Sequence, residues 1–551
     1  MEGQRVGRMR RWRRRLVHAA VAVFALALLA RSGEALWSYF DPFTPAMLQV
    51  HGSSQRVLAE DGSILRVTVT SAGERLLQLR YDELPRLLVR GLVLKEDERF
   101  FEHSGWDPWA TLRAALQNIA AMKVVSGGST LTMQLASVLE GTQRSLLDKF
   151  HEMRRARQIE DLLSKEEILA AYASVVPLGG TLRGFSAASL YWYGRELDQL
   201  QPAEIATLIA MIPAPSKRRP DKRGTRLRSA RDKILRLLLQ AGELSPAQYR
   251  AAIATDPYTK AMGFAFRAPH AVDALLASGA SGDALSSSID LDLQRRVEET
   301  FSQGDSFGVD GHAVVLLDRE SGAVQAMLGS RSWRQIPFNT ATARHDAGST
   351  LKPFLYALAF RLGASSPHRL ELDLPIEEGE YRPRNFDKSF SGQIDASQAL
   401  LRSRNLPAFR LLRRVGVGRF RQELERVGID TSEIPLHLDL ALGTIGVRPI
   451  DLARAYQRLA AEAAAGDAAA NAVLAALRSH SPPGCRGRLQ QAVAWKTGTS
   501  SHRRDAWCAG LSKDHVIVVW LGRLDGRPAP ELVGIRSAAV LFGQLCLALK
   551  Q

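Results

Sequence analysis

The pattern of apolar and polar positions changes several times along the chain. Leu16 to Ala30 is an almost continuous apolar run. Arg56 to about Arg80 alternates in a way typical of short strands. From Leu84 to Gln240 apolar residues recur at helical spacing, and from Ile289 onward helical and alternating patterns are mixed. The pattern therefore predicts an apolar amino-terminal helix, a mainly helical domain and a domain of the α/β (α+β) class.

Capping and turn signals mark the helices of the helical region. Asp107-Pro108 is typical of an N-cap followed by proline in the first turn. Ser164 and Glu167 have the spacing of a capping box. Prolines between positions 213 and 220 interrupt the helical pattern, so they are expected to end the compact helical unit.

Strands are predicted in two parts of the last region. His312 to Asp318 and Ala323 to Leu328 read as a hairpin around Glu320-Ser321-Gly322. Asp505 to Leu511 and His515 to Leu521 read as two further β-rich runs.

These patterns divide the chain into successive segments of different character. They are a basic tail (1–15), an apolar anchor (16–37), a first linker (38–83), a helical domain (84–240), a second linker (241–288) and a mixed domain (289–551).

Composition excludes several classes of protein. A chain of 551 residues is too long for one core, so two or three domains are expected. The three cysteines are an odd number and cannot form a disulfide framework, and their spacing does not suggest zinc. The formal net charge of +16 has no accompanying nucleic-acid-binding motif, and much of it lies in positions 5–15 and 217–233. We therefore expect neither a zinc site nor a nucleic-acid partner.

Three short motifs in a fixed order predict an acyl-transfer site. They are SxxK at Ser349 to Lys352, SxN at Ser403 to Asn405, and KTG at Lys496 to Gly498. The serine and lysine of SxxK are three residues apart, so on a helix they emerge on one face and can share a proton. KTG is expected on a strand before the two β-rich runs, at an edge where backbone N–H groups are offered to a peptide.

A second constellation lies in the helical region. Lys95 to Gly105 concentrates carboxylates beside two aromatic residues, and Gly127 to Leu135 combines a glycine pair with Ser, Thr and Gln side chains. Glu96 would be a carboxylate against apolar neighbours, a setting suited to a general base. The glycine pair allows close approach of the backbone, and the neutral donors suit phosphate or sugar oxygens.

These motifs resemble those of class A penicillin-binding proteins. EDxxFxxHxG and GGSTLTMQL, from Glu96 and Gly127 onward, are similar to the first two motifs of glycosyltransferase family 51. Two further matches span 149–169 and 177–184. The Gly-Gly-Thr-Leu form in the last match and Trp495 before KTG most resemble the penicillin-binding protein 1C subgroup. The chain stops at Gln551, without the carboxy-terminal extension common in that subgroup.

The resemblance implies a bifunctional peptidoglycan synthase with a lysozyme-like glycosyltransferase domain and a penicillin-binding/β-lactamase type transpeptidase domain. In the first domain Glu96 would be the base that activates a sugar hydroxyl. Lys149 would help the diphosphate to leave, with Glu152 as a further catalytic group or a divalent cation in support. Ser129, Thr130 and Gln134 would contact substrate.

For the transpeptidase domain the resemblance implies a serine acyl transfer. Ser349 would be the nucleophile, Lys352 its base and Ser403 a proton relay. The backbone N–H groups of Ser349 and Thr499 would form the oxyanion hole. The peptide would be held by the remaining motif residues, which are Asn405, Lys496, Thr497, Gly498 and Thr499.

Other residues near the glycosyltransferase motifs receive different interpretations. His103 is interpreted as an architectural residue. Of the basic side chains that could line a diphosphate site, only Lys149 is taken as a ligand, because it falls in the lysine-to-glutamate motif of the family. For the others, a run of charges is usually a solvated helix face. Those others are Arg113, Arg154, Arg155 and Arg157.

Two departures from the family pattern concern the first domain. Ala136-Ser137 stands where the family usually has a basic residue, and Tyr172-Ala173-Ser174 where it commonly has Tyr-Leu-Asn. They leave open a scaffold with an inactive glycosyltransferase site. A membrane sensor that keeps the penicillin-binding fold is the other alternative, although a sensor does not need the Glu96 motifs.

The apolar run predicts attachment to the bacterial inner membrane. Seven arginines lie between Arg5 and Arg15, which predicts a cytoplasmic amino terminus and extracytoplasmic domains. As a helix the run would extend about 22 Å, and Arg31 and the residues up to Trp37 lengthen it toward the far interface. A cleaved signal peptide is the alternative, because Gly33-Glu34-Ala35 offers small residues. We favour a single-pass anchor because the implied substrate is a membrane lipid.

The resemblance also implies the partners. They are lipid-linked disaccharide-pentapeptide, nascent peptidoglycan, the membrane, β-lactam antibiotics and other wall-synthesis proteins.

Overall fold

The computed structural model describes residues 39–549 except 50, 123–126, 142–144, 305–306, 377–381, 433–436, 479, 486–488 and 490–492. The basic tail and anchor expected at 1–37 lie outside the described residues. In the part that is described, no helix is both long and apolar enough to cross a membrane. The chain forms two compact units, one containing 67–265 and the residues before 57, the other containing 57–66 and 266–551.

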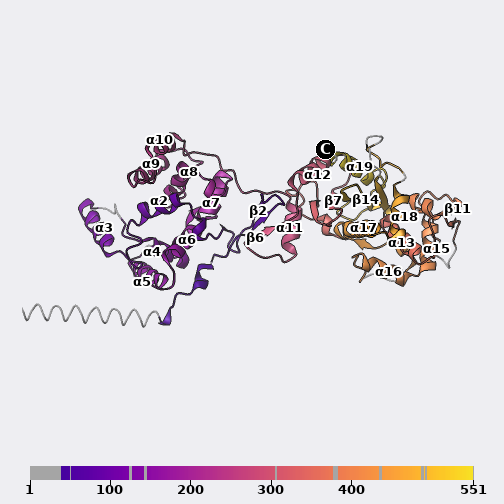
Figure 1. Ribbon diagram of the computed structural model, residues 1–551, viewed down its shortest axis with the longest axis horizontal. Helices are drawn as coiled ribbons and strands as arrows, with labels where there is room; N and C mark the ends of the chain where they lie inside the picture. Colours follow the sequence, from indigo (N-terminus) through magenta and orange to yellow (C-terminus); the bar gives the residue numbers. More distant parts are fainter. Residues whose placement is uncertain are drawn as a thin grey trace, which may run out of the picture. The chain divides into compact units, whose positions relative to one another are not determined.

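The first unit is mainly helical, as its periodicity predicted (Figure 1). A small sheet of β3 (Arg75–Leu76), β5 (Leu182–Arg183) and β4 (Pro177–Gly179) lies beside the helices. The helices are α2 (Arg86–Glu96), α3 (Pro108–Ala121), α4 (Leu131–Glu140), α5 (Leu146–Leu162), α6 (Lys165–Val175), α7 (Gly184–Tyr193), α8 (Pro202–Met211), α9 (Thr225–Gln240) and α10 (Pro246–Ala254).

Helix starts in this unit follow the capping signals of the sequence. The Ser164 hydroxyl accepts from the Glu167 N–H in a complete capping box before α6. The Asp107 carboxylate accepts from the N–H groups of Trp109 and Ala110 at the start of α3. These side chains satisfy N–H groups that have no partner inside the helix, so both predicted starts are confirmed.

In the first unit α5 and α6 pack against α4 (Figure 1). Leu131 and Leu135 of α4 are fully buried in a core that also contains Phe100 and Tyr172. The GGSTLTMQL motif ends in the first turns of α4. This packing therefore fixes the second half of the motif on a rigid element.

The second unit is built on a five-stranded antiparallel sheet of order β13-β14-β15-β7-β8. The predicted hairpin is confirmed as β7 and β8, and the two β-rich runs as β14 and β15. KTG lies on β13, at the edge of the sheet, as predicted. The bounds are β7 (Gly311–Asp318), β8 (Val324–Leu328), β13 (Ala494–Thr499), β14 (Asp505–Leu511) and β15 (His515–Gly522).

Helices cover both faces of this sheet, which explains why its strands are apolar at many positions. Alternate residues of β15 face opposite layers: Val516 and Val518 join one core, whereas Ile517 and Val519 join the other. The second core also contains residues of α12 (Leu291–Gln303) and α19 (Ala538–Ala548).

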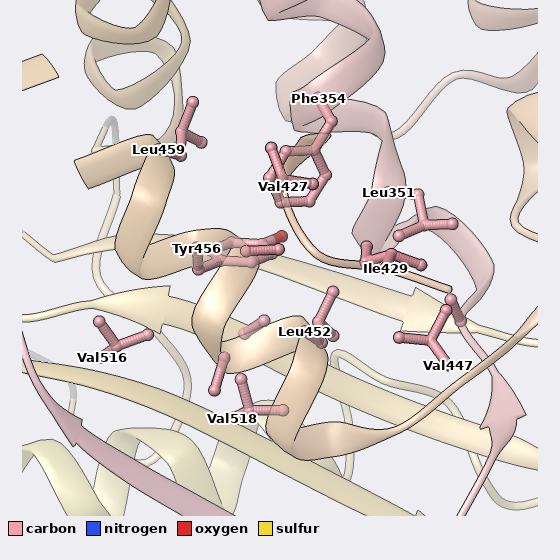
Figure 2. Close-up of a cluster of buried hydrophobic side chains, with 14 of the residues drawn as sticks. Leu351, Phe354, Val427, Ile429, Val447, Leu452, Tyr456, Leu459, Val516 and Val518 are labelled. Atoms are coloured by element: carbon pink, nitrogen blue, oxygen red, sulfur yellow. The ribbon is translucent and has the colours of Figure 1, made fainter. Parts of the chain in front are cut away.

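On the opposite face, α17 (Pro449–Ala464) packs on the sheet, and its Tyr456 ring contacts the Phe354 ring of the SxxK helix α13 (Lys352–Arg361). Figure 2 shows Leu452 and Tyr456 of α17 between Val518 of the sheet and Phe354 of α13. The Tyr456 hydroxyl also donates to the Thr350 carbonyl at 2.9 Å. This buried layer therefore holds SxxK in a fixed place beside the sheet.

The remaining elements of the second unit surround this core. Short strands form three small sheets: β2-β1-β6, β10-β11 and β12-β9. The strands are β1 (Arg56–Leu58), β2 (Ile64–Val67), β6 (Ala284–Ser286), β9 (His345–Asp346), β10 (Leu370–Asp373), β11 (Gly392–Asp395) and β12 (Gly446–Val447). The helices are α11 (Pro269–Ala277), α14 (Ala396–Leu401), α15 (Asn405–Val415), α16 (Val417–Arg426) and α18 (Ala468–Leu477).

Candidate active sites

The three acyl-transfer motifs meet in one cleft of the second unit. The cleft has a volume of about 650 Å³ and is lined by Ser349, Ser403, Asn405, Lys496, Thr497 and Thr499, among other residues. Ser349 lies in a short 3-10 turn directly before α13, and Lys352 is the first residue of α13. SxN begins 54 residues and KTG 147 residues after Ser349 in the chain, and the fold brings both to the same cleft as this serine.

Lys352 is the buried centre of the SxxK and SxN motifs. Its Nζ donates to Asn405 Oδ1 at 2.7 Å and to the Ser403 carbonyl at 2.9 Å. Its side chain is 1% exposed. Burial holds the pKa of Lys352 well below its usual value, and the cations of Lys496 and Arg404 lower it further. A lysine in this setting is readily neutral and can accept a proton.

Lys496 joins KTG to SxN. Its Nζ donates to the Ser403 hydroxyl at 2.8 Å and to the carbonyl of Thr497 at 2.9 Å. Burial lowers the pKa of Lys496 to about 7. Ser403 itself has a left-handed backbone with φ of 58°, a conformation that only a few per cent of non-glycine residues adopt. The hydroxyl of Ser403 is therefore held at Lys496 by a specific turn.

Close backbone packing sets the distance between SxxK and KTG. Gly348 has φ of 55°, and a Cβ at this position would lie 2.8 Å from the carbonyl oxygen of Thr499. A Cβ on Gly498 would lie 2.6 Å from the Ala347 carbonyl oxygen. The Thr499 hydroxyl accepts from the Gly534 N–H at 3.0 Å. Glycine is required at both contacts because the two backbones approach each other directly.

A buried polar network behind SxN was not found from the sequence. The Arg404 guanidinium donates to Asp373, and Asn385 donates to the same carboxylate at 2.6 Å. The side-chain oxygen Oδ1 of Asn385 accepts from the backbone N–H of Asn405 at 2.8 Å. This network fixes the start of α15 and hence the Asn405 side chain. Nothing local to Asp373 in the sequence marks it as the partner of Arg404 and Asn385.

In the first unit Glu96 is the last residue of α2 and is placed against α4. Its carboxylate is 12% exposed and accepts from Gln134 Nε2 at 3.2 Å. The Gln134 carbonyl oxygen accepts from the buried Tyr172 hydroxyl at 2.6 Å, which fixes the direction of the amide. Lys95 Nζ lies 3.4 Å from the other carboxylate oxygen. Glu96 and Gln134, both predicted site residues, are thus in direct contact.

The neighbouring Asp97 connects the end of α2 to the start of α4. Its carboxylate accepts from the backbone N–H of Leu131 at 2.9 Å and is bonded to His103 Nε2 at 3.1 Å. Both side chains are 5% exposed. His103 is therefore a buried partner of a structural carboxylate, as its architectural interpretation expected. Asp97 was not singled out from the sequence, although the acidic run contains it.

Lys149 on α5 contacts two predicted site residues. Its Nζ donates to the Ser129 hydroxyl at 3.1 Å and pairs with the buried Glu152 carboxylate. Thr130 has a different environment, because its hydroxyl donates to the Gly105 carbonyl and accepts from the Met133 N–H as the N-cap of α4. The Thr130 side chain is buried, so its hydroxyl is already engaged within the protein.

The structure accounts for several residues whose role the sequence left uncertain. Arg154 and Arg155 both pair with Asp41, which occupies them within the unit. Ala136 is fully buried in the core. The Ser174 hydroxyl accepts from the Leu79 N–H at 2.9 Å, so it holds a neighbouring loop although it is not asparagine.

Among the described residues, no group of three or more His, Cys, Asp and Glu side chains is arranged to hold a metal ion. Glu152, the carboxylate beside Lys149, is paired with that lysine. Among the residues described in this unit, the acidic side chains near Lys149 do not form a set that fits a resident cation.

Comparison with known proteins gives consistent matches to both halves of the chain. A transglycosylase family model matches residues 61–239, and a penicillin binding protein transpeptidase domain model matches 312–477. Penicillin-binding protein 1C of Escherichia coli is 32% identical over 96% of this chain and 71% of its own length. Penicillin-binding protein 1B of Vibrio cholerae is 28% identical over 86% of this chain and 68% of its own length.

A solved structure has a similar fold. The crystal structure of penicillin-binding protein 1A from Haemophilus influenzae covers 90% of this chain and 92% of its own, with a TM-score of 0.55 and 16% sequence identity.

Proposed function

The chain belongs to the class A penicillin-binding proteins and is a bifunctional peptidoglycan synthase, and we propose that Glu96 and Ser349 carry its two reactions. Peptidoglycan glycosyltransferase and transpeptidase activities belong to the two matched domains. The observation that best supports the residue assignment is the set of contacts that joins Lys352 to Asn405 and Lys496 to Ser403.

In the transpeptidase reaction, Ser349 attacks the penultimate D-Ala carbonyl of a stem peptide and gives its proton to Lys352. The lowered pKa of Lys352 makes its neutral form available for this step. The backbone N–H groups of Ser349 and Thr499 stabilise the oxyanion. The C–N bond then breaks, and the leaving amine takes a proton through Ser403. An amine or water resolves the acyl-enzyme.

The peptide is oriented by the groups around the nucleophile. Asn405 positions the peptide backbone, and Lys496 binds its terminal carboxylate together with Thr497 and Thr499, while Gly498 lets the strand pack closely against SxxK. β13 is an edge strand, so its backbone can pair with an extended peptide. The burial of Lys496 strengthens its attraction for a carboxylate.

In the glycosyltransferase reaction, Glu96 takes the proton from the 4-hydroxyl of one lipid-linked disaccharide. The resulting oxygen attacks the anomeric carbon of another chain, and the bond from that carbon to the undecaprenyl diphosphate breaks. Gln134 orients the Glu96 carboxylate, and Lys149 with Ser129 faces the leaving diphosphate. Glu152 keeps Lys149 in place through their ion pair, and Thr130 supports the site as the N-cap of α4.

A direct experiment tests the Ser349 assignment. The purified chain is incubated with a fluorescent penicillin, digested and analysed by mass spectrometry. The adduct is expected on the peptide that contains Ser349 and on Ser349 itself. An adduct on another serine would place the nucleophile elsewhere.

We further propose that the protein is a single-pass inner-membrane protein with a cytoplasmic amino terminus. The seven arginines before the apolar run support this orientation. Exposed apolar side chains on α3 and α5 of the described part also suit a membrane surface, including Trp109, Ile119 and Phe150, which are 67%, 73% and 70% exposed. Amino-terminal sequencing of the mature protein is expected to begin at or near Met1. A start near Leu36 would instead indicate a cleaved signal peptide.

A further inference from the structure

The side chains that line the acyl-transfer cleft carry more positive charge than the binding of one carboxylate requires. Five of its lining residues are arginine or lysine, whereas Asp387 is the one acidic residue among the described residues that line it. Asp387 is already bonded to Arg404 at 3.0 Å. Among the described residues, no acidic side chain pairs with the other three arginines, which are Arg384, Arg402 and Arg503.

Arg384 is fixed at the SxN side of the cleft. Its backbone carbonyl accepts from Asn405 Nδ2 at 2.9 Å, and the next residue, Asn385, accepts from the backbone N–H of Asn405. The main chain of Arg384 is therefore tied to the asparagine that contacts Lys352. Its exposed guanidinium adds a permanent charge at this wall.

Arg503 is fixed at the KTG side. It follows KTG by a tight turn in which His502 and Arg503 have left-handed φ values of 63° and 57°. Its guanidinium donates to the Pro530 carbonyl at 2.6 Å and lies 5.6 Å from the ring centre of Phe386. Phe386 is 61% exposed and belongs to the loop that carries Arg384. Arg503 therefore reaches from the KTG side toward the SxN side of the cleft.

We propose that Arg384 and Arg503 bind a second carboxylate of the peptide substrate, in addition to the terminal carboxylate bound by Lys496. The proposal rests on the acyl-transfer function proposed for this cleft. Arginine binds carboxylates through two parallel hydrogen bonds and stays charged at every working pH. The second carboxylate belongs either to a side chain of the peptide that acylates Ser349 or to the residue whose amine resolves the acyl-enzyme.

The test measures how well peptides slow labelling of the full chain by a fluorescent penicillin. One pair of peptides ends in D-Ala-D-Ala and differs only in a side-chain carboxylate or carboxamide on the preceding residue. The other pair lacks D-Ala-D-Ala and carries a free side-chain amine beside a carboxylate or carboxamide. The first pair reports on the acylating peptide and the second on the acceptor.

For at least one pair, the carboxylate peptide is expected to compete about tenfold better than the carboxamide in the wild type, as for a charge-assisted hydrogen bond. Arg384→Gln and Arg503→Gln should each bring the ratio of carboxylate to carboxamide competition close to one. Arg384→Lys and Arg503→Lys should keep part of it. Arg527→Gln removes an exposed arginine that does not line the cleft and should leave the ratio unchanged.

Two controls keep the result interpretable. Each ratio compares two peptides on the same variant, so a change in the labelling rate of that variant cancels. A glutamine variant that the fluorescent penicillin does not label is replaced by the lysine variant at the same position. Raising the salt concentration should lower the wild-type ratio, because the second carboxylate is bound at the exposed rim.

A wild-type ratio near one for both pairs overturns the proposal, as does a ratio that persists in both glutamine variants. Failure of all peptides to compete at millimolar concentration also overturns it. None of these results affects the acyl-transfer function, which is tested separately by the loss of label in Ser349→Ala.

Discussion

The Nζ of Lys496 lies 2.8 Å from the hydroxyl oxygen of Ser403, although 93 residues separate them in the chain. One lysine therefore connects the edge strand of the sheet to the SxN turn. Lys352 makes the matching connection from the other side, through Asn405. Two lysines with lowered pKa values thus flank a single SxN turn, with different tasks: Lys352 as base and Lys496 as carboxylate ligand.

This division of tasks predicts how acylation depends on pH. The pKa of Lys496 is lowered to about 7, so the residue loses its positive charge as pH rises through that value, and binding of the penicillin carboxylate should weaken. Burial also holds the pKa of Lys352 well below its usual value, which favours the neutral form that acts as the base. The second-order acylation rate should therefore fall above about pH 7.

Lys496→Arg provides the matched control for this pH dependence. A guanidinium remains charged across the range, so the alkaline fall should disappear even if the overall rate is lower. Rates of penicillin labelling between pH 5 and 10 measure both profiles. An unchanged alkaline fall in Lys496→Arg would assign it to another group.

Gly348→Ala tests the close packing of SxxK against KTG. The new methyl group would meet the Thr499 carbonyl oxygen at 2.8 Å, so the strand and the serine must move apart. Gly363→Ala is the matched control, because Gly363 also has a left-handed backbone, with φ of 66°, but nothing within 4 Å of the added Cβ. Both variants share a backbone cost of roughly 1–2 kcal/mol.

Penicillin labelling should be largely lost in Gly348→Ala and retained in Gly363→Ala, while thermal unfolding shows that both proteins fold. Equal labelling of the two would mean that the contact with Thr499 does not position the nucleophile.

Tyr172→Phe tests the hydrogen-bond chain that ends on Glu96. Without the hydroxyl, the Gln134 amide loses the donor that fixes its direction, and the Glu96 carboxylate loses a defined partner. We expect glycan polymerisation to fall about tenfold, equivalent to about 1.4 kcal/mol. Tyr249→Phe, in α10 of the same unit, should polymerise normally. Normal polymerisation by Tyr172→Phe would show that the amide needs no such support.

The elements that the sequence predicted well are those with a local signal. The β7-β8 hairpin and strands β14 and β15 follow from apolar runs bounded by turn residues, and α6 follows from its capping box. The position of KTG on an edge strand follows from the β14 and β15 runs, because the motif directly precedes them.

The contacts that the sequence did not predict depend on residues far apart in the chain. Nothing near Asp373 indicates that it accepts from Arg404, and nothing near Asp97 indicates that it caps the backbone of Leu131. The Thr130 hydroxyl was expected to face substrate, since a serine- and threonine-rich turn has the same composition whether it binds a ligand or caps a helix. Tertiary packing decides between these uses.

The central claim is that two independent sites, one at Glu96 and one at Ser349, act within one chain. The most direct measurement follows glycan polymerisation from lipid-linked disaccharide and labelling by fluorescent penicillin in the same preparations of wild type, Glu96→Gln and Ser349→Ala. Glu96→Gln keeps the shape of the side chain and removes its basicity, so polymerisation should fall at least ~10²-fold while labelling is unchanged. Ser349→Ala should lose the label and polymerise normally. Normal polymerisation by Glu96→Gln, or persistent labelling of folded Ser349→Ala, would contradict the account.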